Sequence, residues 1–154
     1  MSQQQSLDQQ RASYAQKCVR QAGGDAEKYR DAARGIGGLI LADGLGQAMA
    51  FLASKMGGQN RLYRDFQKWL CDRAPGAPYR PQENHEQNLI ESIAAKDSTS
   101  LRRATVESLA LCVWLKRFAD IDEAKRKAPQ VSSEKQPTTA QDSSLAQAPS
   151  GVRK

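Results

Sequence analysis

The sequence has little of what most catalytic and redox sites require. Histidine occurs once, and the three cysteines, Cys18, Cys71 and Cys112, are far apart, with no Cys-x-x-Cys pair. A four-ligand zinc site would have to gather all four of these residues without any paired spacing. We therefore expect the cysteines to be reduced, buried core residues, and we expect no bound metal.

Long apolar segments are also missing. No run approaches the roughly 20 apolar residues that cross a bilayer, and the opening residues MSQQQ have neither a basic nor an apolar signal segment. We therefore expect a cytoplasmic protein with no membrane contact. At 154 residues the chain has the usual size of one domain and can bury a single core.

The two ends of the chain are poor in large apolar side chains. Five of the first ten residues are glutamine, and the sequence from Pro129 onward consists mostly of Ser, Gln, Ala, Thr and Pro. Such segments bury too little surface to offset the entropy lost on ordering. The predicted organisation is a disordered N-terminus at residues 1–6, a helical domain at 7–127 and a disordered low-complexity tail at 128–154.

Between these ends, apolar residues recur at helical spacing, and no stretch shows the strict alternation of a half-buried strand. The pattern predicts an all-α fold, a compact bundle of about five to six helices. A second helix should begin near the N-cap Asp25 and end at the break Asp43-Gly44. The other expected helices are residues 7–22, 45–56, 59–73, 83–95 and about 97–125.

Glycines mark several of the expected boundaries. Gly23-Gly24 should end the first helix, and Gly57-Gly58 should close the third, in which Leu45, Met49, Leu52 and Met56 form one apolar stripe. The Gly37-Gly38 pair lies inside the second helix. It predicts either a kink or a close approach of another helix.

The last helix contains the most apolar segment of the chain. Residues 109–115 are apolar on every side, which predicts that the other helices surround them as the spine of the core. The pairs Arg102-Arg103 and Lys116-Arg117 flank this segment, 14 residues apart. That spacing is about 21 Å along a helix and only about 40° around it, so both pairs can lie on one side of the domain.

The formal net charge of +6 and the pI of about 9.4 favour a polyanionic partner, although many basic domains are merely soluble. The helix at 59–73 is amphipathic: it should bury its apolar side and expose a basic face on the opposite side. Tyr63 and Tyr79 are candidates for stacking on bases, and equally for core packing. The candidate residues for contact with a phosphate backbone are Lys55, Arg61, Arg64, Lys68, Arg102, Arg103, Lys116 and Arg117.

No catalytic constellation emerges from the sequence. His85 lies between acidic residues beside a proline-rich loop, where a solvated helix start is a simpler explanation than a site. Asp120, Asp122 and Glu123 carry oxygen ligands suited to Mg²⁺. The neighbouring cations Lys116, Arg117, Lys125 and Arg126 are expected to pair with these carboxylates instead. The glycine pairs match no phosphate-binding loop. We therefore predict no enzyme, no cofactor and no small-molecule substrate.

Two blocks of the sequence resemble a known family. The segment TVESLAL at 105–111, followed by WLKRFA at 114–119, resembles the C-terminal signature of the small subunit of type III-B CRISPR effectors, the fifth protein of the Cmr set. DGLG at 43–46 with AFLASK at 50–55 is similar to the same family, and Arg11-Ala12, Ala15 and Tyr29 fit as well. The resemblance covers residues 7–121. The Gly37-Gly38 pair and the tail depart from the family pattern.

The resemblance implies a helical subunit present in several copies in a ribonucleoprotein that serves antiviral defence. Its implied partners are the other Cmr subunits, namely the backbone repeat subunit and the large subunit, neighbouring copies of itself, and the guide and target RNA. Target RNA is cut by the backbone subunit, so this chain would be a non-catalytic brace. Lys55, Lys116 and Arg117 take an RNA-contacting role by motif, whereas the other five candidates rest on helix geometry.

Two other functions stay open at this point. A free-standing helical nucleic-acid binder or regulator would need an exposed recognition helix that reads a DNA groove. A nuclease would need the three carboxylates Asp120, Asp122 and Glu123 to hold Mg²⁺.

Overall fold

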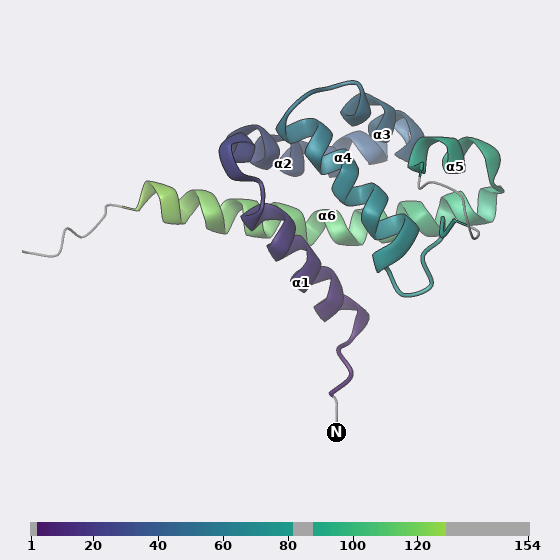
Figure 1. Cartoon of the computed structure of the whole chain (residues 1–154), viewed down its shortest axis with the longest axis horizontal. Coiled ribbons are helices and arrows are strands. Elements are labelled where there is room, and N and C mark those ends of the chain that lie inside the picture. The colour runs from purple at the N-terminus through teal and green to yellow at the C-terminus, as the bar shows by residue number, and fades with distance from the viewer. Residues whose placement is uncertain (1–2, 82–87, 129–154) are drawn as a thin grey trace, which may run out of the picture.

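A computed structural model describes residues 3–81 and 88–128, and every regular element within these residues is a helix (Figure 1). This confirms the predicted all-α fold. The elements are α1 (Leu7–Arg20), the 3₁₀ turn η1 (Gly23–Asp25), α2 (Ala26–Asp43), α3 (Leu45–Ala53), α4 (Gly58–Lys68), the π-helical segment η2 (Trp69–Arg73), α5 (Leu89–Ala95) and α6 (Ser98–Lys127). None of these helices is long and apolar enough to cross a membrane.

The long helix α6 organises the fold. It runs along the molecule beneath α2, α3, α4 and α5, while α1 crosses it and projects away from the other helices (Figure 1). α6 packs mainly against α1 and α2, and α4 packs against α2. The largest fully buried side chains come from almost every element: Tyr29, Leu45, Met49, Leu52, Leu62, Phe66, Leu70, Tyr79, Leu89, Leu111 and Leu115.

Local sequence signals explain where the helices begin. Ser6 and Gln9 form a reciprocal capping box at the start of α1. Asp97 caps α6 by accepting a hydrogen bond from the Ser100 backbone N–H at 2.7 Å. Asp25 is the N-cap residue of α2, as predicted, but its side chain makes no capping hydrogen bond, because the residue also ends the 3₁₀ turn that precedes α2.

The predicted glycine positions lie between helices, except that Gly57-Gly58 does not close the third helix: Gly57 is the N-cap residue of α4 and Gly58 its first residue. Gly23, Gly44 and Gly57 all have positive φ, the conformation that glycine adopts most easily. The third helix is shorter than expected, since α3 ends at Ala53. Met56 is consequently 87% exposed and does not continue the stripe of Leu45, Met49 and Leu52.

The Gly37-Gly38 pair does not kink the chain, because α2 is continuous from Ala26 to Asp43. A Cβ atom at Gly37 would lie 3.5 Å from Cys112 Cβ on α6, whereas one at Gly38 would meet nothing within 4 Å. Of the two alternatives, close approach of another helix is therefore the correct one. Gly37 faces Cys112 of α6, at a distance where an added Cβ atom would make ordinary van der Waals contact.

The predicted spine is only partly interior. Leu111, Cys112 and Leu115 are buried, but Val113 is 57% exposed and Trp114 is half-buried. The expectation that other helices surround residues 109–115 on every side was wrong, because α1 and α2 cover only two sides of α6. The remaining side of this apolar segment faces outward.

Some predictions fall outside the described residues. His85, the start of the helix expected from residue 83, and nearly all of the predicted tail at 128–154 belong to this group. The three-part organisation of 1–6, 7–127 and 128–154 stays a prediction.

Candidate nucleic-acid interface

The candidate cations of α6 lie on the side that the other helices leave open. Arg102, Arg103, Lys116 and Arg117 are all exposed. Arg102 and Lys116 lie within about 40° of each other around the helix axis, and so do Arg103 and Arg117. The structure thus places both pairs on the open side of α6, as the spacing predicted.

An apolar stripe separates the two cation pairs. Val106 is 63% exposed and Val113 57% exposed, and the half-buried Leu109 lies between them along the helix. From α2, the exposed Leu41 lines the same shallow hollow as Leu109 and Val113. An exposed apolar surface of this kind is typical of a region that a partner covers.

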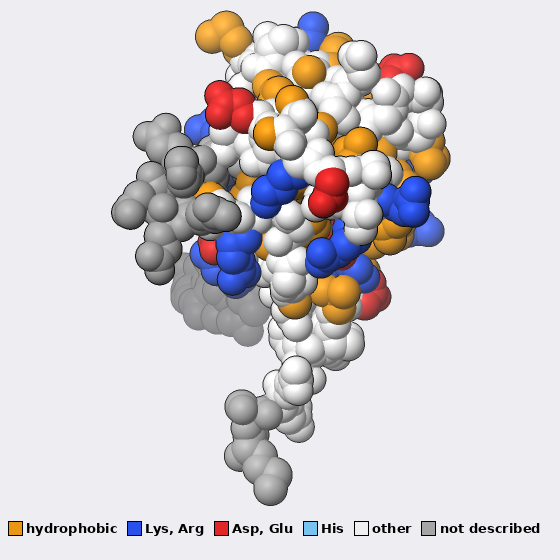
Figure 2. Space-filling model, turned by 90° about the vertical axis from the view of Figure 1, so that its right-hand side faces the viewer, with side chains coloured by type: hydrophobic (Ala, Val, Ile, Leu, Met, Phe, Trp, Pro, Cys, Tyr) orange, Lys and Arg blue, Asp and Glu red, His pale blue; other side chains and the backbone are white. Residues whose placement is uncertain are grey.

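The eight candidate cations differ from Arg11, Arg30 and Arg34 in their pairing. Within the described residues none of the eight forms an ion pair, whereas Arg11, Arg30 and Arg34 are all paired with carboxylates on α6. Figure 2 views the molecule from the end where α5 and the start of α6 lie. Lys and Arg side chains gather across the middle of this face, above the projecting end of α1.

The candidates on α3 and α4 are more dispersed. Arg64 and Lys68 are exposed, but Arg61 is half-buried, and its Nε is buried with no hydrogen-bond partner among the described residues. Lys55 follows α3, and its Nζ lies 4.7 Å above the ring centre of Phe51. The structure therefore places the four cations of α6 along one side of that helix and does not bring all eight into one site.

Neither of the two tyrosines considered for base stacking is fully exposed. Tyr79 is 1% exposed, which fits core packing and rules out stacking on a base in this conformation. Tyr63 is half-buried, and its hydroxyl donates a hydrogen bond to Gln67 Oε1 at 3.1 Å.

The carboxylates considered as a magnesium site are held by arginines from α2. Arg34 donates to Asp120 and Glu123, and Arg30 donates to Asp122 at 2.8 Å. Arg126, one of the expected partners, also pairs with Asp122 at 3.1 Å. Lys116 and Arg117, which were expected to do the same, form none of these pairs, because α2 runs alongside this part of α6 and supplies closer cations. Within the described residues, no group of three or more His, Cys, Asp or Glu side chains could hold a metal ion.

The motif residues Arg11 and Glu107 have a structural role. The Arg11 guanidinium donates Nε and Nη2 to the two carboxylate oxygens of Glu107 at 2.8 and 2.7 Å. Trp69 Nε1 donates to the same carboxylate at 2.9 Å. Burial alone would raise the pKa of Glu107, but the hydrogen bonds from Arg11 and Trp69 lower it below its usual value. This cluster joins α1, η2 and α6.

Tyr29, another motif residue, fixes α4. Its hydroxyl donates to Asp65 Oδ2 at 2.6 Å, and the Tyr14 hydroxyl donates to the Asp65 backbone carbonyl at 2.6 Å. Burial raises the pKa of Asp65, against the lowering effect of the Tyr29 hydrogen bond. The Arg11 and Tyr29 motifs therefore hold the bundle together.

The three cysteines are buried and unpaired, as predicted. Burial raises the pKa of Cys18 and of Cys112 to about 12, and that of Cys71 to about 11. We expect none of them to react with a thiol reagent such as DTNB in the native protein at pH 8, and all three to react in denaturant. A stoichiometric fast-reacting thiol in the native protein would contradict this assignment.

Comparison with known proteins decides the family. The sequence matches the family described as CRISPR-associated protein (Cas_Cmr5) over residues 7–122. The chain belongs to the Cmr5 family. Among solved structures, it is similar to a CRISPR-associated Cmr5 family protein from Thermus thermophilus, with 28% identity and a TM-score of 0.62. The match covers 77% of this chain and 97% of the other. No curated protein matches the sequence.

Membership of the Cmr5 family confirms the resemblance drawn from residues 105–119 and 43–55. It implies that the chain is a subunit of a Cmr complex. The matched region spans α1 to the greater part of α6, so it includes the Arg11–Glu107 cluster and the open side of α6.

Proposed function

We propose that this Cmr5-family chain is a non-catalytic structural subunit that braces a type III-B RNA-targeting effector and contacts guide or target RNA through the open side of α6. The observation that carries the proposal is the arrangement of Arg102-Arg103 and Lys116-Arg117 at the two ends of an exposed apolar stripe. The cation pairs are exposed and have no carboxylate partner among the described residues. Contacts from such residues to phosphate do not depend on base sequence.

The apolar stripe supports the bracing role. Val106, Val113 and Leu41 are exposed on the neighbouring helices α6 and α2, so they would stay in contact with water in an isolated domain. A subunit of a complex can bury these apolar side chains against a partner. We propose that the partners are the backbone repeat subunit, the large subunit or a neighbouring copy of this chain. The RNA would then pass along the cations at the margins of that contact.

The carboxylates of α6 favour a brace over a nuclease. Asp120, Asp122 and Glu123 are bound by Arg30 and Arg34, which neutralise the charge that a divalent metal would otherwise meet. These ion pairs tie α2 to the second half of α6.

Replacing Lys116 and Arg117 together by alanine tests the RNA contact in a reconstituted effector. Because both side chains are exposed and unpaired, we expect the fold and the assembly to be unchanged. The complex should bind target RNA about fivefold to tenfold more weakly at moderate salt. The slope of log K against log salt should be shallower by about 1.4, since two phosphate contacts to a single strand are lost.

The matched control replaces Lys28 and Lys125, two exposed lysines outside the candidate set, by alanine. This variant loses the same charge and should retain nearly normal affinity. Equal weakening in both variants would show that only net charge matters, and unchanged binding of the Lys116 and Arg117 variant at several salt concentrations would remove the proposed contact. Sequence-selective duplex DNA binding by the isolated chain would instead favour the free-standing regulator.

A further inference from the structure

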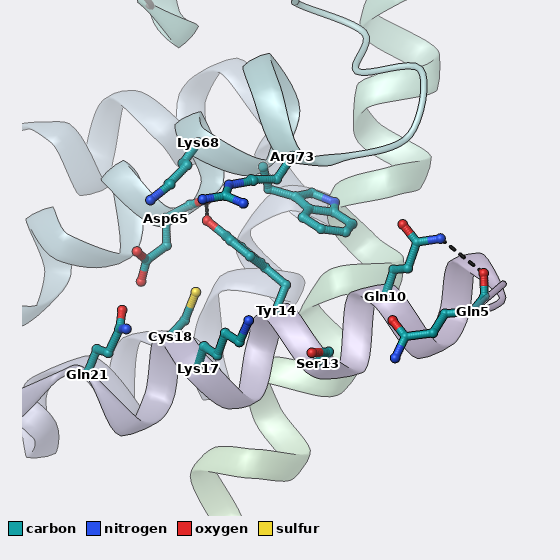
Figure 3. A pocket seen from close by; sticks show the side chains of 11 residues that line it. Gln5, Gln10, Ser13, Tyr14, Lys17, Cys18, Gln21, Asp65, Lys68 and Arg73 are labelled. Carbon is teal, nitrogen blue, oxygen red and sulfur yellow. Dashed lines mark hydrogen bonds between the residues drawn. The ribbon is translucent and has the colours of Figure 1, made fainter. Parts of the chain in front are cut away.

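A polar hollow lies between α1 and the α4–η2 segment, away from the open side of α6. Its volume is about 530 Å³, within the usual range of small-ligand sites. Figure 3 shows α1 along one wall and the end of α4 with η2 along the other. The lining residues from α1 include Ser13, Lys17 and Gln21, at steps of four, so one face of this helix turns polar groups into the hollow.

Three cations line this hollow from three different elements. Lys17 comes from α1, Lys68 ends α4 and Arg73 ends η2. Within the described residues Lys17 and Lys68 have no ion-pair partner, and Arg73 has only a long contact of 3.7 Å to its neighbour Asp72. In Figure 3, Lys17 extends from one wall and Arg73 from the other, and both approach Tyr14.

The π-helical turn moves Arg73 toward the side of the helix that carries Lys68. In a regular α-helix, Asp72 would lie about 40° from Lys68, while Arg73 would lie about 140° from it. In η2 the Ala74 N–H instead donates to the Trp69 carbonyl at 2.9 Å, a bond that spans five residues. This wider turn places Arg73 nearer to the Lys68 side of the helix than regular α-helical geometry would. Arg73, and not Asp72, lines the hollow beside Lys68.

The side chains that line the hollow carry a net positive charge, although one of them is acidic. Asp65 is the only carboxylate among the lining residues, and its Oδ2 accepts a hydrogen bond from Tyr29. Three cations against one carboxylate leave a net positive charge. The Ser13 hydroxyl and the Gln21 amide add neutral hydrogen-bonding groups beside the cations.

We propose that this hollow binds the phosphate group of a nucleotide, with Lys17, Lys68 and Arg73 around the phosphate and Ser13 and Gln21 toward the sugar or base. The inference rests on the proposed function only for the source of the nucleotide, which we take to be single-stranded RNA. It adds a second RNA contact, on the opposite side of α1 from the Glu107 cluster. A free mononucleotide has the same chemistry and is distinguished by the test.

The test exchanges two neighbouring charges in the full-length chain. Asp72→Arg combined with Arg73→Asp keeps the composition and the net charge, and both side chains are more than half exposed, so the fold should tolerate it. Fluorescence anisotropy with a labelled single-stranded RNA should show affinity reduced about tenfold, because a carboxylate replaces a guanidinium beside the phosphate.

The matched control exchanges another adjacent exposed pair, Glu27→Lys with Lys28→Glu, on the first turn of α2. This variant should bind RNA within about twofold of the unaltered chain, since nothing places these residues at the hollow. If the variant with Asp72 and Arg73 exchanged binds RNA as well as the control does, RNA binding at this hollow is overturned. That result would leave the contact by Lys116 and Arg117 untouched.

Competition with AMP and inorganic phosphate shows whether the bound phosphate group belongs to RNA or to a free nucleotide. If RNA is the ligand, each competitor should displace the labelled RNA only at concentrations far above that of unlabelled RNA. If AMP binds the chain as tightly as RNA does, and the exchange abolishes its binding, the hollow is a phosphate site for free nucleotides. That outcome supports the hollow and counts against RNA at this position. Absence of any effect of the exchange on all three ligands overturns the proposal.

Discussion

Replacing Gly58 by alanine is expected to destabilise the fold by about 2–4 kcal/mol, which lowers the melting temperature by on the order of 10 °C. A Cβ atom at Gly58 would lie 2.6 Å from the backbone nitrogen of Tyr29 and 2.7 Å from the backbone carbonyl oxygen of Asp25. Both neighbours are backbone atoms of the η1–α2 junction, so neither can rotate away. The start of α4 would have to separate from α2, which loosens Tyr29 and its bond to Asp65.

The expected loss of stability in Gly58→Ala is opposite in sign to the change that helix propensity alone would give. Gly58 is the first residue of α4, where alanine alone would favour the helix. Gly38→Ala is the matched control, because a Cβ atom there meets nothing within 4 Å and the residue lies inside α2. Thermal unfolding should show that variant unchanged or stabilised by up to about 1 kcal/mol. Equal stability of the two variants would mean that α4 does not approach α2 as closely as described.

Replacing Glu107 by alanine is expected to cost about 3–5 kcal/mol, because it removes one partner of a largely buried ion pair. The side chains of Arg11 and Glu107 are 16% and 13% exposed, so neither charge is well solvated. The variant leaves the Arg11 guanidinium and the Trp69 N–H without their shared acceptor. Denaturant unfolding measures the loss, and Glu107→Gln, which keeps the size and one acceptor, should lose less.

The same cluster predicts a pH dependence. The pKa of Glu107 is lowered in the folded chain, so its stabilising contribution is present above the unfolded value near 4.3 and is lost as the pH falls through the folded value. Stability of the unaltered chain should therefore fall more steeply toward acid than that of Glu107→Gln. A Gln variant with the same acid dependence as the parent would show that Glu107 contributes little through its charge.

Helical periodicity predicted most of the fold because the buried faces of α1 to α4 repeat at three and four residues. It could not predict the π turn, since Trp69, Leu70 and Cys71 are all buried and give the same pattern in either register. Nor could it place Val113, because composition does not say how many helices pack around α6. Met56 was misplaced because the chain leaves the α3 helix at Ala53, three residues earlier.

The candidate site was predictable where the signal lay along one helix and not where it depended on contacts between helices. The 14-residue spacing put Arg102-Arg103 and Lys116-Arg117 on one side of α6. The pairing of Arg30 and Arg34 with the α6 carboxylates joins residues 86 to 92 positions apart, which no local pattern reports. Lys17 and Arg73 were missed because only the packing of α1 against η2 brings them to one hollow.

The residues of the Cmr5-family motifs fall into two groups: some stabilise the helix bundle, and others are candidates for RNA contact. Arg11, Tyr29 and Glu107 are committed to bonds within the bundle, so their role is to fix the positions of α1, α4 and α6. Lys116 and Arg117 lie on the side that these bonds leave open. Substitutions of Arg11, Tyr29 or Glu107 should therefore lower the stability of the fold. Substitutions of Lys116 or Arg117 should instead weaken RNA binding.

Reconstitution of the Cmr complex with and without this chain tests the central claim most directly, with retention of target RNA as the readout. If the chain is a structural subunit that contacts RNA, its omission should yield shortened or unstable assemblies that hold target RNA weakly, and adding it back should restore both properties. Complexes that assemble fully and hold target RNA equally well without the chain would contradict the account.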